Sequence, residues 1–411
     1  MTPKVDAARL LARMDAFAAI GATPKGGVNR QALSPEDRQA RAMLAEIAAA
    51  RGFALRQDTA CNLFARRAGI DADLPPLLIG SHLDSQPTGG RFDGALGVLA
   101  ALEVLEALSD AGVSTPRPVE LVSWTNEEGS RFQPGALGSR AFVEGGLRPE
   151  WLKARDKAGT TLEAALRDTL AALPGVCVER PGHPIAAYLE LHIEQGPVLE
   201  REGIAIGAVT GIQGTRWYDV TYTGSAAHAG TTPLAFRRDP MAAASAALAD
   251  LFRTIMPGDE DVRLTVGRIS ASPGSINAVP AEVRFSIDLR HPTPQGLARH
   301  EASVRAVLAD AARDHGCSVD VVPMMDMAAV AFPETMVELV EEGARSAGAS
   351  HRRILSGAFH DATFIAGIAP AAMLFSPCRD GVSHNEAEFV DPASVVCAAE
   401  VLLSTCLLWL K

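Results

Sequence analysis

The sequence predicts an α/β protein with a mixed, mostly parallel sheet, into which a smaller α+β unit is inserted. Three segments each begin with an apolar run typical of a buried strand and end in a polar cluster: PPLLIGSH (75–82), PVELVSWTNEEG (118–129) and AYLELHIEQG (187–196). A helix-like segment follows Asp93 and Gly94, and strands that alternate with helices indicate an α/β sheet. Ligands of such sheets lie beyond the carboxyl ends of the strands, where we expect the polar clusters.

The middle of the chain has a different pattern. RWYDVTYTG alternates at period two and is followed by a helix-like PMAAASAALADLFRTI, by RLTVGRIS and EVRFSIDLRH, by a helix from about Gln295 to His315, and by SVDVVPMM. This order suits an α+β unit whose helices cover one face of its sheet. We predict an inserted domain at residues 212–328 and a discontinuous larger domain at residues 1–211 and 329–411.

Length and composition exclude several classes of protein. A chain of 411 residues favours two domains, and a formal net charge of −11 at pH 7 argues against nucleic acid as the main partner. The N-terminus resembles an amphipathic helix rather than a signal peptide, and no apolar run approaches membrane-spanning length. The six cysteines form no C-x-x-C pair, which favours buried reduced thiols. We therefore expect a cytoplasmic protein that binds neither nucleic acid nor membrane.

Imidazole and carboxylate groups gather in the polar clusters, and together they suit zinc, manganese, cobalt or nickel rather than calcium. Asp84 follows two residues after His82, so its carboxylate can accept the proton of the second ring nitrogen. Glu127 and Glu128 cannot both point the same way in extended backbone, so one can bind metal while the other faces the substrate water. Each candidate taken singly has an ordinary explanation as a loop or capping residue; the set is His82, Asp84, Asp93, Glu127, Glu128, His192, Glu194 and His384.

Seven motifs resemble, in order, those of one family. They are HLDSQPTGGRFDG, WTNEEGSRF, LELHIEQGPVLE, SAAHAGTTP, SINAVPAEVRFSIDLR, SGAFHDA and GVSHNEAEF. The chain resembles the amidase/hydantoinase/carbamoylase group of dinuclear zinc amidohydrolases, which is related to the M20 peptidases and aminoacylases. This resemblance spans nearly the whole chain. It implies a zinc-peptidase-like catalytic domain with an inserted lid and dimerisation domain, and therefore a homodimer.

The resemblance also implies a site for two divalent metal ions, zinc first, with manganese, cobalt or nickel as alternatives. Asp93 would bridge the two ions, because a shared carboxylate offsets the repulsion between two cations. His82 and His192 would complete different ions. The full ligand set would be His82, Asp93, Glu128, His192 and His384. Glu127 would act as the general base and then as the general acid.

Further residues would bind a small carboxylate substrate. By resemblance, His228 of the inserted domain reaches the site of a partner subunit and polarises the scissile carbonyl or its oxyanion. Asn277 and Arg290 would hold the substrate carboxylate, for which a guanidinium fork is suited. A structural strand-end arginine is the alternative for Arg290. Gln195 would touch the ureido group, and Arg216 is a weaker candidate.

His360 and Asp361 in SGAFHDA are a second histidine and aspartate pair. We expect His360 to support the site rather than to bind metal. The family usually shows glycine before this histidine, where this chain has Phe359, which leaves the local shape of the pocket open.

The motifs SQPTGGRFDG and GVSHNEAEF resemble the carbamoyl-amino-acid branch more than the peptidases. The expected reaction is hydrolysis of the ureido C–N bond of an N-carbamoyl amino acid to the free amino acid, carbon dioxide and ammonia. β-Ureidopropionase, allantoate amidohydrolase and ureidoglycolate-type enzymes are alternatives with the same chemistry. An M20 aminoacylase or dipeptidase would need room for an acyl chain. From another class, a non-catalytic binding protein with this fold would bind no metal.

Overall fold

The computed structural model describes residues 2–411, which fold into two compact units. The first unit contains the chain up to Thr210 together with Phe332–Lys411, and the inserted unit is Gly211–Ala331. The boundaries lie where β7 (Ile206–Ile212) pairs with β15 (Val330–Ala331), with Ile212 opposite Val330. They differ slightly from the expected boundaries, 211/212 and 328/329, because the two ends of the insertion are themselves paired strands.

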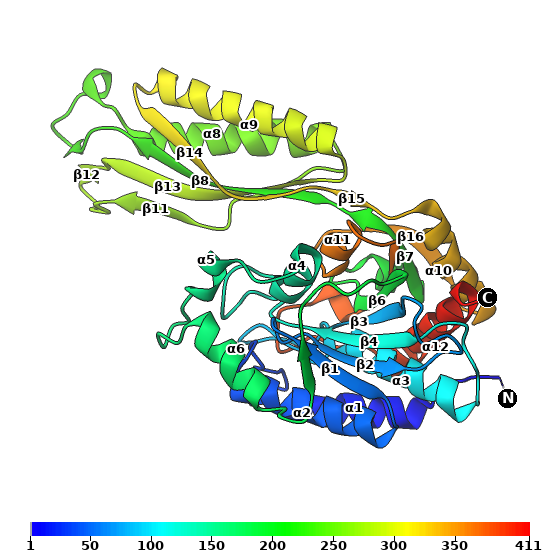
Figure 1. Ribbon diagram of the computed structural model, residues 1–411. Helices are drawn as coiled ribbons and strands as arrows, with labels where there is room; N and C mark the ends of the chain where they lie inside the picture. Colours follow the sequence, from blue (N-terminus) through cyan, green and yellow to red (C-terminus); the bar gives the residue numbers. More distant parts are fainter. Residues whose placement is uncertain (1) are drawn as a thin grey trace. The chain divides into compact units, whose positions relative to one another are not determined.

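The first unit is built on a ten-stranded sheet with the order β15-β7-β17-β6-β3-β4-β2-β1-β5 and with β16 beside β7, in which the edge strand β15 is the last segment of the insertion (Figure 1). The central strands β17, β6, β3 and β4 run parallel, whereas β7, β2 and β1 add antiparallel pairs at the flanks. The predicted α/β class is confirmed, although the parallel pairing lies mainly in the centre. Besides β7 and β15, the strands are β1 (Ala54–Asp58), β2 (Leu63–Arg67), β3 (Leu77–His82), β4 (Val119–Trp124), β5 (Cys177–Glu179), β6 (Ala187–Ile193), β16 (His351–Ser356) and β17 (Ala371–Ser376).

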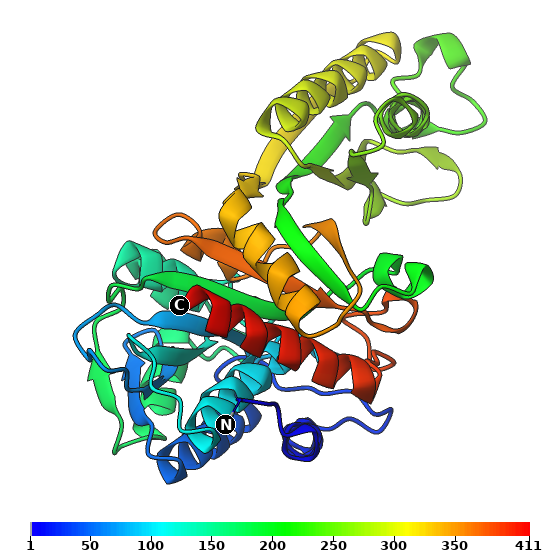
Figure 2. The ribbon, with the colours of Figure 1, turned by 90° about the vertical axis from the view of Figure 1, so that its right-hand side faces the viewer.

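Apolar helices cover this sheet. α3 is buried along almost its whole length and contacts β3, β4 and β6. α12 packs beside α3 and α10, and Figure 2 shows α12 (red) next to α10 (orange). α2 begins as its sequence indicates, with the Ser34 side chain accepting from the backbone N–H of Asp37 and with Pro35 in its first turn. The helices are α1 (Ala7–Ala19), α2 (Pro35–Ala50), α3 (Ala95–Asp110), α4 (Leu137–Glu144), α5 (Pro149–Leu152), α6 (Leu162–Ala171), α7 (Val198–Glu202), α10 (Glu334–Ser346), α11 (Ala362–Ile365) and α12 (Pro392–Trp409), with a 3-10 turn at Arg379–Gly381.

α12 is the single helix among residues 2–411 that is long and apolar enough to cross a membrane, with a mean hydropathy of 1.7 over 18 residues. The expectation that no apolar run approaches membrane-spanning length is therefore wrong for this segment. In the fold, 44% of the helix is buried, and it contacts α10, α3, β17 and β6. A core helix meets the same criteria of length and composition, and the contacts of α12 are those of a core helix.

All six cysteines are free thiols. Cys61, Cys378 and Cys406 are buried, as expected. Cys177 is exposed because it lies in β5, the edge strand of the sheet.

The inserted unit has the α+β order that the sequence predicts. Its five-stranded sheet has the order β10-β13-β8-β14, with β11 beside β13, and α8 and α9 cover one face (Figure 1). The predicted single strand RLTVGRIS is broken into β10 and β11, which both pair with β13. The elements are β8 (Gly214–Thr223), β9 (Ala227–His228), α8 (Pro240–Thr254), β10 (Arg263–Thr265), β11 (Ile269–Ser272), β12 (Ala278–Val279), β13 (Glu282–His291), α9 (Pro294–Asp314) and β14 (Ser318–Met327), with 3-10 turns at Leu234–Phe236 and Met256–Gly258.

Candidate active site

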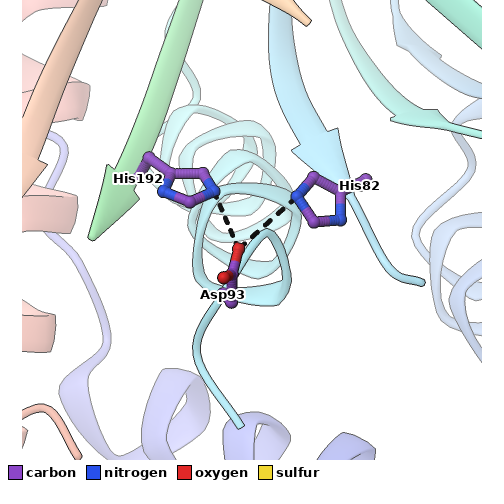
Figure 3. A group of neighbouring side chains, drawn as sticks. All are labelled: His82, Asp93 and His192. Carbon is purple, nitrogen blue, oxygen red and sulfur yellow. Dashed lines mark ion pairs between the residues drawn. The ribbon is translucent and has the colours of Figure 1, made fainter. Parts of the chain in front are cut away.

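The parallel centre of the first unit brings three candidate ligands together. His82 ends β3 and His192 lies near the end of the neighbouring β6, while Asp93 lies just before α3. Asp93 Oδ1 is 3.6 Å from His82 Nε2 and 3.1 Å from His192 Nε2 (Figure 3). All three residues are buried, so they form a compact group of the kind that can hold a cation.

A second group forms on the other oxygen of the same carboxylate. His384 Nε2 lies 3.4 Å from Asp93 Oδ2 and 3.3 Å from Glu128 Oε2. Asp93 therefore faces two groups with its two oxygens, which is the geometry of a bridging ligand. The prediction that His82 and His192 serve different ions does not fit this geometry, because both rings face Oδ1.

The histidines are oriented to offer Nε2 to a cation. His82 Nδ1 lies 2.9 Å from the carbonyl oxygen of Asp84, and His192 Nδ1 lies 3.0 Å from that of Ile193. A carbonyl oxygen only accepts, so each Nδ1 carries a ring proton and each Nε2 faces the Asp93 carboxylate, with His192 Nε2 also accepting the backbone N–H of Gly94 at 3.3 Å. His82 Nε2 is buried and has no hydrogen-bond partner among the described residues.

The charge balance also fits a divalent cation. Burial lowers the pKa of His82 to about 4, so this ring is neutral at pH 7. Burial and the neighbouring carboxylates raise the pKa of Glu127 and of Glu128 well above the ordinary value. An uncompensated cluster of buried carboxylates is costly, and a divalent cation offsets this cost. The donor set of nitrogen and oxygen suits zinc, manganese, cobalt or nickel.

Asp84 has a different partner from the one that the sequence analysis expected. Its carboxylate lies 4.0 Å from His82 Nδ1, beyond hydrogen-bond distance. Instead it accepts the backbone N–H groups of Glu127 and Glu128, each at 3.2 Å. The expectation was wrong because the backbone carbonyl of Asp84, not its side chain, lies next to the ring. Asp84 therefore holds the two glutamates in place.

The two glutamates face different groups, as their adjacency in the chain indicates. Glu127 Oε2 lies 3.6 Å from His82 Nε2, whereas Glu128 Oε2 lies beside His384 and accepts a hydrogen bond of 2.7 Å from Gln86 Nε2. Asn126 precedes them in the left-handed region, with φ of 55°, and its side-chain amide donates to the carbonyls of Phe132 and Pro134. A strained backbone held by such bonds is common at functional sites.

Two further residues near Asp93 have left-handed backbones, Gln195 (φ 56°) and His384 (φ 53°). Gln195 Nε2 donates to Asp93 Oδ2 at 2.9 Å and to Ser383 Oγ at 3.2 Å, so Gln195 lies at the site. Its neighbour Glu194 does not, because its carboxylate accepts the backbone N–H groups of Val198 and Leu199 at the start of α7.

One glycine is required by the close approach of chain segments at this site. Gly94 has φ of 64°, and a Cβ there would lie 2.3 Å from His82 Cε1. Glycine therefore lets α3 begin directly against the ring, which places Asp93 beside His82.

His360 packs behind the site and belongs to neither ligand group of the described residues. Its ring lies 4.5 Å from that of His192, and its Nε2 is 2.9 Å from Ser356 Oγ. Burial lowers the pKa of His360 well below the ordinary value, so the ring is neutral. Phe359, the departure from the family pattern, lies against Gly135 in the loop that follows Glu128.

Arg30, which was not predicted as a site residue, is buried and binds the segment that follows His82. Its guanidinium donates to the carbonyl oxygens of Leu83 and Phe17, each at 2.7 Å. Its backbone N–H donates to Ser85 Oγ, and the adjacent Val28 pairs with Gly89. The signal was present in the sequence, since GGVNRQAL places an arginine in a loop that resembles the family.

The candidates in the inserted unit are more dispersed. His228 and Asn277 are exposed; His228 ends β9, where it is opposite Ala278 of β12, and Asn277 lies just before β12. His228 Nδ1 accepts the backbone N–H groups of Gly230 and Thr231, so the neutral ring carries its proton on Nε2. Arg290 in β13 donates to both oxygens of Asp288. Arg216 in β8 pairs with Glu301 and Asp326, which gives it a structural role within this unit.

The fold and the site define a class of protein: enzymes with a mixed α/β sheet in which imidazole and carboxylate groups surround a shared aspartate at the carboxyl edge of the central strands. The chain belongs to peptidase family M20/M25/M40, whose pattern matches residues 78–407. This finding confirms the family resemblance that the motifs indicated.

Similar proteins cover nearly the whole chain. N-carbamoyl-L-amino acid amidohydrolase of Geobacillus stearothermophilus is 37% identical over 97% of each chain. Allantoate amidohydrolase of Bacillus subtilis is 35% identical over 91% of this chain and 90% of its own. The crystal structure of an amidase of the hydantoinase/carbamoylase family from Burkholderia multivorans matches with a TM-score of 0.92, at 43% identity over 98% of each chain.

Proposed function

We propose that this protein is a metal-dependent amidohydrolase that cleaves the ureido C–N bond of N-carbamoyl amino acids, with free amino acid, carbon dioxide and ammonia as products. The observation that carries the proposal is the pair of ligand groups that share Asp93, with Glu127 beside them. The similarity to an N-carbamoyl-L-amino acid amidohydrolase along the whole chain supports the substrate class.

The site would hold two divalent ions, zinc first among manganese, cobalt and nickel. His82 and His192 would bind one ion, Glu128 and His384 would bind the other, and Asp93 would bridge them. Bound there, the ions supply Lewis acidity toward the ureido carbonyl and the attacking water.

Glu127 would move the proton. It is only 5% exposed and lies beside the His82 group rather than the His384 group. It would take a proton from the attacking water and deliver it to the leaving nitrogen. Asp84 supports this role by holding the backbone N–H of Glu127. Gln195 would touch the ureido group from its position on Asp93.

The inserted unit would bind the substrate carboxylate and the developing oxyanion. Arg290 offers a guanidinium fork that can exchange Asp288 for a substrate carboxylate, and Asn277 offers an amide donor. His228 carries a proton on Nε2 that it can donate to an oxyanion. We infer a homodimer in which this donor is His228 of the partner subunit, and a cytoplasmic location. A fully active monomer in sedimentation would contradict the dimer.

The alternative substrates differ either in the carboxylate part that carries the ureido group or in the acyl group that replaces the carbamoyl group. The first test is a substrate panel with the zinc-reconstituted protein: N-carbamoyl amino acids of both hands, 3-ureidopropionate, allantoate, an N-acetyl amino acid and a dipeptide. We expect the highest kcat/KM for an N-carbamoyl amino acid. A higher kcat/KM for allantoate or 3-ureidopropionate would identify the protein as an allantoate amidohydrolase or a β-ureidopropionase instead. A higher kcat/KM for the acetyl or peptide substrate would contradict the proposal.

Metal removal tests the same proposal independently of the substrate. Dialysis against a chelator should abolish turnover, and added zinc, manganese or cobalt should restore it. Metal analysis that finds no bound ion after reconstitution would favour the non-catalytic binding protein.

A further inference from the structure

Glu388, in the loop between β17 and α12, reaches the chain segment that carries Asp93. It is only 3% exposed. Its Oε1 accepts the backbone N–H of Phe92 at 2.9 Å and of Asp93 at 3.1 Å. The carboxylate lies over Gly90, where a Cβ would be only 1.9 Å from Glu388 Cδ. The segment before α3 is therefore shaped to admit this carboxylate.

The second oxygen of Glu388 reaches the side chain of Asp93 through a serine. Glu388 Oε2 lies 3.2 Å from Ser383 Oγ, and the same hydroxyl lies 2.9 Å from Asp93 Oδ2. Gln195 Nε2 donates to both Ser383 Oγ and Asp93 Oδ2, so Gln195 is a third contact that fixes the position of the Ser383 hydroxyl. Asp93 is thus fixed at its backbone by Glu388 and at its carboxylate by Ser383.

This arrangement controls the rotation of one carboxylate. Asp93 faces the His82 group with Oδ1 and the His384 group with Oδ2. After rotation about its last side-chain bond, the carboxylate could still reach one group, but its two oxygens could not face both groups, so the orientation matters for holding a second ion. Of the two Asp93 oxygens, Oδ2 is the one beside Ser383 Oγ, at the shorter of the two distances that this hydroxyl makes to carboxylates, so the hydrogen bond opposes this rotation.

We propose that Glu388, acting through Ser383, is a positioning residue that keeps the two oxygens of Asp93 on separate ligand groups and thereby sets the affinity for the second of two divalent ions. The proposal rests on the proposed function of this site as a dinuclear metal site. Changes behind the residues that bind a metal directly typically weaken metal binding by about 10–100-fold. A residue that only stabilised the loop would change the melting temperature without changing the affinity of one ion.

The test is a zinc titration of the metal-stripped full-length protein, with cobalt absorption spectra as a second readout. Glu388→Ala should weaken one of two binding steps by about 10–100-fold and leave the other within about threefold. Glu388→Gln keeps an oxygen for the two backbone N–H groups and should remain within about threefold of wild type. Ser383→Ala removes only the side-chain contact and should weaken the same step as Glu388→Ala, to a smaller degree.

Glu386→Ala is the matched control, because Glu386 lies in the same loop but pairs with Lys25 rather than with the Asp93 segment. It should bind both ions as wild type does. Equal affinities in wild type and in Glu388→Ala would overturn this proposal alone, since the wild type would still bind two ions. A wild type that binds no divalent ion would overturn the proposed function as well. If Glu388→Ala does not fold, Ser383→Ala carries the test, and unchanged binding in that variant overturns the proposal.

Discussion

Each unit of this protein contains two histidines around one aspartate, yet the two groups differ in where the protons lie. In the first unit, Nδ1 of both His82 and His192 faces a carbonyl oxygen, so both rings offer Nε2 toward Asp93. In the inserted unit, His291 and His300 point Nε2 at Asp259 Oδ2, at 3.3 Å and 2.8 Å.

In the second group, hydrogen bonds already join both rings and an arginine to the aspartate. The backbone N–H of Thr293 donates to His291 Nδ1 at 3.0 Å, closer than the carbonyl of the same residue at 3.2 Å. This contact places the proton of the neutral ring on Nε2, facing Asp259. The guanidinium of Arg299 also lies 2.7 Å from the same oxygen and already supplies a positive charge. Two histidines and one aspartate therefore do not have the same proton positions in every fold, because the partner of Nδ1 decides whether Nε2 carries a proton.

The largest effect is expected when a histidine is removed from the group around Asp93 rather than from the group around Asp259. His192→Ala should lose bound metal and reduce turnover by more than about a hundredfold, because it removes a ligand rather than a supporting residue. His300→Ala is the matched control in the inserted unit and should keep the metal content and activity of wild type. Metal analysis and kcat on an N-carbamoyl amino acid measure both. Loss of one metal ion from His300→Ala would show that the second group binds metal after all.

The next effect concerns chemistry with the metal still in place. Glu127→Gln should retain both ions but lower kcat by about a thousandfold, within the range for loss of a general acid and base. Glu46→Gln, an exposed change on α2, serves as the control. If metal-loaded Glu127→Gln turns over within a few-fold of wild type, another group is the base.

A smaller effect is expected from the residue that holds the two glutamates. Asp84→Asn replaces one of the two accepting oxygens by an NH₂ group, which cannot accept from the backbone N–H of Glu127 or Glu128. Activity should fall by about 10–100-fold. Asp73→Asn, exposed before β3, should leave activity unchanged. The prediction is contradicted if metal content and kcat of Asp84→Asn equal those of wild type.

The smallest expected effect distinguishes two arginines of the inserted unit. Arg290→Lys should raise KM about tenfold with little change in kcat, because a lysine cannot form the two parallel bonds of a guanidinium with a carboxylate. Arg216→Lys should leave KM unchanged, since Arg216 is paired with Glu301 and Asp326. If Arg216→Lys raises KM and Arg290→Lys does not, Arg216 rather than Arg290 binds the substrate carboxylate.

The sequence predicts the convergence of the site because its ligands follow directly after apolar strands. His82 and His192 lie at the ends of β3 and β6, Glu128 lies in the loop that follows β4, and neighbouring parallel strands end at the same edge. The class of the inserted unit is predictable for a similar reason, since the alternation of EVRFSIDLRH marks β13 over its full length.

Other features depend on contacts between distant segments and could not be predicted. The carbonyl of Asp84, rather than its carboxylate, faces His82 because of the local path of the chain after β3. The sharing of Asp93 Oδ1 by His82 and His192 follows from the adjacency of β3 and β6, which no local pattern specifies. The motif GVSHNEAEF was recognised for His384, yet the contact of Glu388 with Phe92 and Asp93 joins segments that are 295 or more residues apart.

The pairing of β7 with β15 makes the protein modular. Because Gly211 lies opposite Ala331 and Ile212 opposite Val330, the chain leaves and re-enters the first unit at adjacent points. Residues 213–329 could therefore be excised and replaced by a tight turn, which would convert the two connecting strands into an ordinary hairpin. Such a miniature protein would retain all five candidate metal ligands and Glu127 while lacking His228, Asn277 and Arg290. It would thereby separate the capacity to bind metal from the capacity to bind substrate.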